Sequence, residues 1–240
     1  MQIVIPSKGR ADIIAGRTLK WFPDAIVSVG EDEVDAYSNV VAKDKLLVHP
    51  ANVVGIGPLR QWILDNVADP VVYMIDDDLK QLYDQTGFKK RRITDPAEAQ
   101  AIVERVAIVA QDAGARVFGF QICARPIAYR PFDPYHLNAW VGGSIGIIGR
   151  ELRYDTSLLL RADIDFCLKS LMRDRIVMVD GRFDFAYDLF AGSGGGAKLR
   201  SQERHQTEIK YLLKRWGKYL HTRESATQIH FGIKVPRRAK

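Results

Sequence analysis

The stretch from Tyr73 to Leu79 constrains the fold of this chain more than any other, because an apolar run ends there in three adjacent carboxylates. The β-branched and aromatic residues before the triplet favour a buried strand. Asp76, Asp77 and Asp78 cannot share a dry core, so water, cationic partners or a divalent metal must relieve their repulsion. The triplet therefore marks the end of a strand, which is where open α/β sheets place their ligands.

The spacing within the triplet suits a metal ion. In an extended backbone Asp76 and Asp78 point to one side of the strand and Asp77 points to the other. Two carboxylates on one side can bind a hard cation such as Mg²⁺ or Mn²⁺ while phosphates and water complete its shell. An acidic turn that caps a following helix explains the same residues, and the triplet alone leaves both interpretations open.

Length and composition indicate a globular protein. The 240 residues are 47% hydrophobic, which is enough for a sizeable core in one large domain or two fused halves. No apolar run approaches the length of a membrane span and the N-terminus lacks a signal-peptide pattern, so we expect no membrane partner and a cytoplasmic location. Cys123 and Cys167 lack metal-ligand spacing, which predicts reduced thiols.

The positive charge of the chain is a property of its tail. The formal net charge is +6, yet residues 1–197 hold 23 Lys and Arg against 26 Asp and Glu, and residues 198–240 hold 12 against 3. Such asymmetry predicts a polyanionic partner, either nucleic acid or a membrane surface. A solvated helix followed by a frayed basic end is the alternative interpretation.

Alternating strands and helices in the first half predict an α/β protein with a mostly parallel sheet, whereas the second half is less regular. The clearest helix start is Asp95, an N-cap followed by Pro96 at the first helical position and Glu98 at the third. The predicted strands are residues 2–6, 25–29, 46–49, 71–75, 117–122, 144–148 and 176–179. The predicted helices are residues 13–21, 58–67, 96–110, 164–173 and 198–216.

Four motifs follow one another in a recognisable order. They are Ile5-Pro6-Ser7-Lys8-Gly9-Arg10, then Gly55-Ile56-Gly57-Pro58-Leu59-Arg60, then the strand into Asp76-Asp77-Asp78, then Gly142-Gly143-Ser144 with Asp163-Ile164-Asp165 about twenty residues later. Over residues 1–190 this set resembles the GT-A nucleotide-sugar glycosyltransferases. The resemblance implies a single domain over residues 1–240 with a Rossmann-type, mostly parallel sheet flanked by helices. Its parts would be a nucleotide-binding half (1–80), an acceptor half (81–197) and a basic helix and tail (198–240).

The resemblance also implies a donor site for a nucleotide sugar, most simply a UDP-sugar, and a Mn²⁺ or Mg²⁺ cofactor. Asp76 and Asp78 correspond to the metal-binding pair of the family. The third metal ligand would be a late histidine, with His205, His221 and His230 as candidates and His205 as our choice. The residues expected along the donor are Pro6, Ser7, Lys8, Arg10, Gly57, Arg60, Asp76 and Asp77.

Sugar transfer with inversion requires a carboxylate that takes the proton of the acceptor hydroxyl. Asp163 and Asp165 are the candidates, and we favour Asp163, which would begin the following helix. Family members often carry an acidic pair before this aspartate, whereas this chain has Arg161 and Ala162. A plain N-cap role for Asp163 stays open, and a retaining enzyme would need no such base. The acceptor-side residues implied by the family are Trp140, Gly142 and Gly143.

The acceptor is indicated by the basic residues. Lys89, Lys90, Arg91 and Arg92, with Lys210 and Lys214 of the last helix, suit phosphate contacts. The opening motif and the acidic strand also resemble the phage-type, TET-associated glycosyltransferases, which implies a hydroxymethylated pyrimidine of DNA, such as 5-hydroxymethylcytosine, as acceptor and a host-cytoplasmic location.

The target base would then have to leave the stack, and residues 86–94 and 192–197 would be mobile covers. The competing interpretations are a transferase acting on a glycan or small molecule, a nucleotidyltransferase with the same metal geometry, and a nucleic-acid-binding module with a structural acidic turn.

Overall fold

The computed structural model describes residues 1–121, 129–187, 199, 201–224 and 229–236. The predicted loop at 192–197, the end of the strand predicted to reach residue 122, and Cys123 lie outside these ranges. Cys167 is a free thiol buried in the core, where its Sγ accepts a hydrogen bond from the backbone N–H of Val141.

The N-terminal half forms the parallel part of the sheet, as predicted. Its strands lie in the order β3-β2-β1-β4, and every neighbouring pair is parallel. The side chains of the three inner strands β2, β1 and β4 are largely buried because helices cover both faces, whereas the edge strand β3 is only partly buried. The four strands are β1 (Gln2–Pro6), β2 (Ile26–Gly30), β3 (Leu46–His49) and β4 (Val71–Ile75).

The second half extends the same sheet beyond β4 in the order β9-β7-β10-β5-β6, with β8 paired to β10. Strands β5, β8 and β9 run against the direction of the others, so the ten-stranded sheet is mostly parallel. The sequence predicted β7 and β9 but not β5, β6 or β8, and only the first residues of β10. The strands are β5 (Leu79–Asp84), β6 (Arg91–Ile93), β7 (Val117–Gln121), β8 (Tyr135–His136), β9 (Ser144–Ile148) and β10 (Met178–Tyr187).

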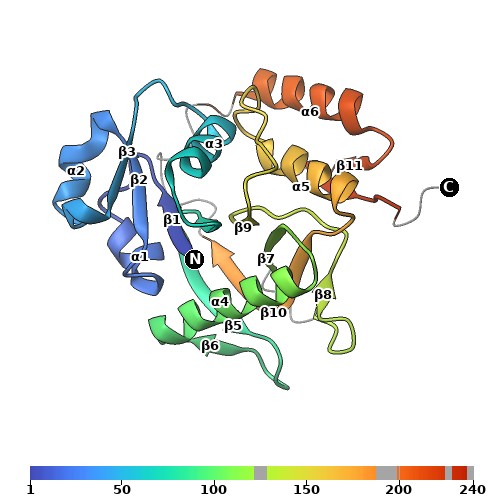
Figure 1. Ribbon diagram of the computed structural model, residues 1–240, viewed down its shortest axis with the longest axis horizontal. Helices are drawn as coiled ribbons and strands as arrows, with labels where there is room; N and C mark the ends of the chain where they lie inside the picture. The colour runs from blue at the N-terminus through green and yellow to red at the C-terminus, as the bar shows by residue number, and fades with distance from the viewer. Residues whose placement is uncertain (122–128, 188–198, 200, 225–228, 237–240) are drawn as a thin grey trace.

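Helices cover both faces of the sheet (Figure 1). Helices α1 (Thr18–Trp21) and α4 (Pro96–Asp112) pack on one face in one hydrophobic cluster, while α3 (Ile56–Asn66), α5 (Ala162–Arg173) and α6 (Gln202–Trp216) belong to the cluster on the other. Helix α2 (Val34–Ser38) lies beside β2 and β3. Asp95 caps α4 as predicted, because its side chain accepts a hydrogen bond from the N–H of Ala97.

The C-terminal segment differs from its prediction. Helix α6 begins at Gln202 rather than at residue 198, with Ser201 as its N-cap. It is followed by a separate antiparallel hairpin of β11 (Leu220–Glu224) and β12 (Ile229–Ile233), which the sequence did not predict. None of the helices in the described ranges has the length and apolar character needed to span a bilayer.

Candidate active site

The acidic triplet lies where β4 leaves the sheet. Asp76, Asp77 and Asp78 form a turn rather than an extended strand, so the predicted alternation of their side chains does not occur. The backbone of the turn is fixed from two sides. The N–H of Asp76 donates to the carbonyl of Gly143 at 2.7 Å, and the Thr18 hydroxyl donates to the carbonyl of Asp76 at 2.7 Å. Thr18 also accepts from the N–H of Leu79, a role that no local motif indicates.

Asp77 points into the protein, and the loop after β1 binds it. Its side chain is 5% exposed, and its carboxylate accepts from the Ser7 hydroxyl and from Arg10 Nη1, both at 2.5 Å. Arg10 Nη1 also reaches Asp78 at 3.1 Å. Ser7 and Arg10, which we expected along the nucleotide, therefore use these groups to fix the triplet.

The rest of the opening motif surrounds this network. Tyr37, which the sequence did not single out, shares a 2.6 Å hydrogen bond with Ser7 and accepts from the N–H of Arg10. Burial raises the pKa of Tyr37 to about 12, so its hydroxyl keeps its proton. Pro6 is buried at the end of β1, and Lys8 is exposed.

Arg60 is the central cation of the site. Its side chain is only 1% exposed on α3, and its two terminal nitrogens bind different carboxylates. Nη2 donates to Asp76 at 3.1 Å, and Nη1 donates to Asp163. Burial opposes the charge of the guanidinium, but the two carboxylates outweigh it and hold the pKa of Arg60 above its usual range. The guanidinium that we expected to meet the diphosphate is thus shared between two aspartates.

Gly57 is buried, and its role is to allow close packing. A Cβ at this position would collide with the carbonyls of Leu158 and Asp155, so only glycine lets α3 approach the turn before α5 so closely. This close approach is what brings Arg60 within reach of Asp163.

The carboxylates around Arg60 hold their protons more tightly than usual. Burial, reinforced by the charges of Asp78 and Asp163, raises the pKa of Asp76 to about 7, although Arg60 opposes the shift. Burial also raises the pKa of Asp78 and of Asp163, again against the effect of an arginine. The side chain of Asp76 is 39% exposed, so its carboxylate is the one that a solute can reach most directly.

Two carboxylates of this cluster supply the oxygen atoms that a hard divalent cation prefers. Arg60 takes Oδ1 of Asp76 and Arg10 takes Oδ2 of Asp78, so neither arginine engages the second oxygen of its partner. Clustered carboxylates with raised pKa values are groups whose charge a cation can stabilise in place of protons. Asp76 and Asp78 are the residues that would hold it, with solvent and phosphate oxygens as further ligands.

The predicted third ligand is not brought to this place. In the described ranges, no three His, Cys, Asp or Glu side chains form a group that could hold a metal. His205 lies on α6, where its Nδ1 is 2.9 Å from Arg161. His221 is exposed on β11, and the side chain of His230 is outside the described residues.

The two candidate bases occupy different environments in the first turn of α5. Asp163 faces Arg60 and is 14% exposed. Asp165 is fully buried and accepts from the Trp216 indole at 2.8 Å, with Lys169 also at 2.8 Å. Asp165 contacts other residues of α5 and residues of α6, so it joins these two helices. Asp163 instead belongs to the triplet cluster, which consists of the three aspartates of the triplet with Arg10, Arg60 and Asp163.

Glu208 of α6 holds the loop that leads to Asp163. Its buried carboxylate accepts from the three successive N–H groups of Leu159, Leu160 and Arg161 at 2.9–3.2 Å. The carbonyl of Leu159 in turn accepts from the N–H of Ile56 at the start of α3. Glu208 was not among the predicted site residues, because its only distinguishing feature in the sequence is an acidic side chain beside the apolar stripe of a basic helix.

Of the residues predicted for the acceptor side, Gly143 contacts the triplet directly. Gly143 has a φ of 77° and supplies the carbonyl that binds Asp76, and a Cβ there would meet the ring of Tyr187. Gly142 lies against the ring of Trp140. The Trp140 indole donates to the carbonyl of Phe231 at 3.1 Å, so this tryptophan fastens the β11-β12 hairpin.

The basic residues predicted to contact DNA lie in two places. Lys89, Lys90 and Arg92 are exposed around the β5-β6 turn, whereas Arg91 is bound by Asp84 and Glu98. Residues 86–94, predicted as a mobile cover, include strand β6. Lys210 and Lys214 are exposed on α6. Helix α6 lies at the top of the view in Figure 1, whereas β5 and β6 lie at the bottom.

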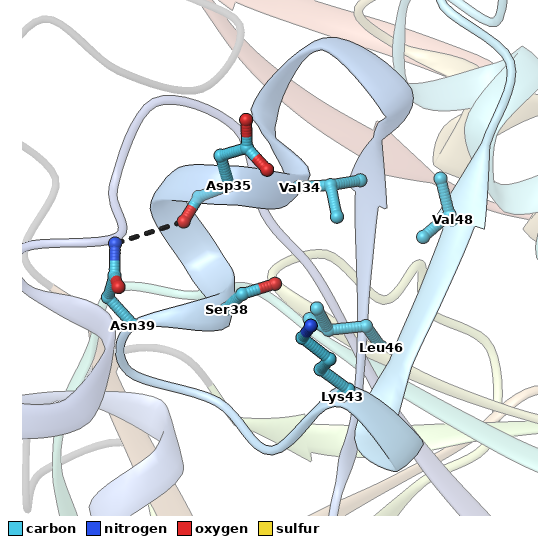
Figure 2. Close-up of a pocket in the computed structure, with 7 residues that line it drawn as sticks. All are labelled: Val34, Asp35, Ser38, Asn39, Lys43, Leu46 and Val48. Carbon is cyan, nitrogen blue, oxygen red and sulfur yellow. Dashed lines mark hydrogen bonds between the residues drawn. The ribbon is translucent and has the colours of Figure 1, made fainter.

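A surface depression elsewhere lies between α2 and β3 (Figure 2). The hydrogen bond inside it joins the Asn39 side chain to the carbonyl of Asp35. It contains none of the residues of the triplet cluster, so it is not the reaction site that the geometry indicates. Its lining residues are Val34, Asp35, Ser38, Asn39, Lys43, Leu46 and Val48.

Comparison with known proteins identifies a family that matches most of the chain. The model of a family described as TET-Associated Glycosyltransferase matches residues 1–186. No curated protein matches the chain.

Solved structures share the fold at low identity. A mycobacterial protein has a TM-score of 0.51 at 13% identity, covering 97% of this chain and 82% of its own. Mannosyl-3-phosphoglycerate synthase from Rubrobacter xylanophilus has a TM-score of 0.50 at 14% identity, covering 96% and 83%. These two likenesses support the predicted GT-A-like fold class. S. aureus TarS 1–349 scores 0.45 at 12% identity, covering 77% of this chain, which spans 60% of that structure.

Proposed function

The chain belongs to the TET-associated glycosyltransferase family, and from this premise we propose that it moves a sugar from a UDP-sugar to a hydroxymethylated pyrimidine of DNA. The observation that carries the proposal is the shared guanidinium of Arg60, which keeps Asp76 and Asp163 in one cluster. One carboxylate would then serve the donor and the other the acceptor, within reach of the same anomeric carbon.

On the donor side, Asp76 and Asp78 would hold Mn²⁺ or Mg²⁺. When bound, such an ion would offset the charge that develops on the departing diphosphate. Arg10 and Ser7 contribute by holding the turn in shape, since their contacts go to Asp77 and Asp78. Lys8 is exposed beside this turn and is the opening-motif residue best placed to meet a phosphate.

On the acceptor side, Asp163 would take the proton of the hydroxymethyl group. The oxygen then forms a bond to the anomeric carbon while the bond from that carbon to the diphosphate breaks. Burial raises the pKa of Asp163 while its ion pair with Arg60 opposes the shift, and a raised pKa makes the carboxylate a stronger general base. On the same side we propose Gly143, whose carbonyl holds Asp76, and Gly142 beside it, with the rings of Trp140 and Tyr187 packed against these glycines.

Two sets of cations are available for the DNA backbone. We propose phosphate contacts for Lys89, Lys90 and Arg92 of the β5-β6 turn and for Lys210 and Lys214 of α6, all of them exposed. Arg91 would contribute less, because Asp84 and Glu98 already neutralise it.

Mass spectrometry of 5-hydroxymethylcytosine DNA tests the proposal. The DNA is incubated with the protein, Mn²⁺ and a panel of UDP-sugars, and a mass gain of one sugar per modified base is expected. Asp163→Asn should lose this product while staying folded, whereas Asp112→Asn, an exposed aspartate at the end of α4, should keep it. UDP-sugar hydrolysis without any DNA product would instead indicate a glycan or small-molecule acceptor.

A further inference from the structure

We propose that the β5-β6 turn and the segment before β8 form a two-pronged aromatic edge that stacks against the bases of a DNA duplex beside the target site. The two prongs are Phe88 and Phe132. The inference rests on the proposed DNA acceptor and adds the surface that would hold the duplex, which the catalytic cluster does not provide.

Both phenylalanines are far more exposed than such side chains normally are. The relative exposure is 103% for Phe88 and 88% for Phe132, against 58% for Ile108 on α4. A phenylalanine gains roughly 1.5–3 kcal/mol when it is buried, so each exposed ring offers a partner a favourable contact.

The segments that carry the two rings are hydrogen-bonded to neighbouring residues of β10. The N–H of Gln85 donates to the carbonyl of Arg182 at 2.8 Å, and the N–H of Gly181 donates to the carbonyl of Pro134 at 2.8 Å. Phe88 follows Gln85 by three residues, and Phe132 precedes Pro134 by two. Hydrogen bonds to two consecutive β10 residues therefore anchor the segments that carry both phenylalanines beside the same part of that strand. The β5-β6 hairpin and β8 both lie in the lower part of Figure 1.

The charge around the prongs selects the partner. Lys89, Lys90 and Arg92 are exposed close to Phe88, whereas Phe132 has one exposed cation and one exposed acid nearby, Arg130 and Asp133, so the positive charge lies mainly at Phe88. Lys90 also lies 4.3 Å over the ring of Tyr83. An exposed ring near cations suits insertion between two base steps of a duplex, because the ring then meets the π-face of a base while the cations meet the phosphate backbone. An apolar protein partner would leave these cations buried and unpaired.

Chain geometry sets where the prongs meet the duplex. Strand β5 starts at Leu79, directly after Asp78, and runs six residues to Asp84. At about 3.3 Å per residue, this strand carries the hairpin turn roughly 20 Å from the triplet. One strand of B-DNA advances about 3.4 Å per nucleotide, so the contact falls about six base pairs from the base that enters the site.

Fluorescence anisotropy with duplex DNA tests the edge. Phe88→Ala and Phe132→Ala should each weaken binding by about fivefold or more, without changing the dependence of the affinity on salt. Ile108→Ala is the matched control and should bind as the parent protein does. Replacing Lys89, Lys90 and Arg92 by alanine should lower the salt slope by about 2 to 3.

Duplex length gives a second readout. A duplex with three base pairs on each side of the target should bind the parent and Phe88→Ala equally, whereas one with ten on each side should separate them. The inference is overturned if both phenylalanine variants bind long duplexes as Ile108→Ala does. It is also overturned if Phe88→Ala impairs binding to anionic vesicles and not to DNA.

Failure of this inference can be told apart from failure of the proposed function. Sugar transfer by the parent protein, with DNA affinity unaffected by the two phenylalanines, would remove the aromatic edge alone. Phenylalanine-dependent DNA binding without any sugar transfer would remove the proposed reaction and leave the edge. Hydrolysis of the UDP-sugar without DNA should be unchanged in Phe88→Ala, because this residue lies outside the triplet cluster.

Discussion

Replacing Arg60 by methionine tests the ion-pair cluster at the centre of the site. The guanidinium is 1% exposed and its closest partner, Asp163, is 14% exposed, whereas Asp76 is 39% exposed and can be rehydrated. Removing one partner of a buried pair costs about 3–5 kcal/mol, because the remaining charge is left without compensation. Since only Asp163 is left in a poorly hydrated place, we expect a loss of about 3 kcal/mol in the free energy of unfolding.

Chemical denaturation measures this loss, and for a chain of this length it corresponds to a fall of roughly 6–12 °C in Tm. Arg153→Met is the matched control. Arg153 pairs with Asp65 at 2.8 Å, but its side chain is 62% exposed, so we expect a change of at most about 0.5 kcal/mol.

A double-mutant cycle then shows which of the two aspartates is the main partner of Arg60. Combining Arg60→Met with Asp163→Asn should recover at least about 1.5 kcal/mol of the loss, while the cycle with Asp76→Asn should recover less. The reasoning is refuted if Arg60→Met costs no more than Arg153→Met, or if the cycle with Asp163 shows no coupling.

Three further outcomes are expected. Burial raises the pKa of Asp184 to about 6, and among the described residues neither of its oxygens has a hydrogen-bond partner. The folded state therefore holds the proton more tightly than the unfolded state, and stability should fall as pH rises from about 4 to 6. Asp184→Asn should remove this fall and raise the free energy of unfolding at pH 8 by up to about 3 kcal/mol in denaturant titrations. Glu208→Gln should slow sugar transfer at least about tenfold with an unchanged KM for the UDP-sugar, because the loop before Asp163 loses its anchor and loosens. The control is Glu203→Gln, which changes an exposed glutamate of the same helix, and an equal loss of activity in this control would contradict the prediction. Chelation should abolish hydrolysis of the UDP-sugar and Mn²⁺ should restore it in the parent protein but not in Asp78→Asn, whereas full activity in the chelator would exclude the metal role.

The sequence predicted the parallel half of the sheet well because each of those strands is a short, strongly apolar run. It failed where tertiary contacts override the pattern. Strand β10 carries Asp180 and Asp184 in fully buried positions, which no hydrophobic pattern anticipates. Strand β5 follows the triplet directly, and its Leu79 and Leu82 are three residues apart, a spacing that does not indicate a strand.

The candidate site was likewise predictable only in part. The sequence identified Arg10, Arg60 and Asp163 by their residue types and motif positions, and the structure brings all three to the triplet. It did not predict that both arginines bind aspartates, because partner choice depends on the packing of α3 against the turn before α5. Thr18 and Glu208 act through hydrogen bonds to distant backbone groups, which leave no mark in local sequence.

Helix α6 lies beyond the family match and holds the loop that leads to Asp163. The match ends at residue 186, yet the carboxylate that fastens the approach to α5 comes from residue 208. A shortened protein cut at the family boundary would keep every motif residue and still lose the brace behind Asp163. Relatives without such a helix must offer another acceptor to those three amides, and the region that replaces it is where divergence in catalytic rate within the family should be sought.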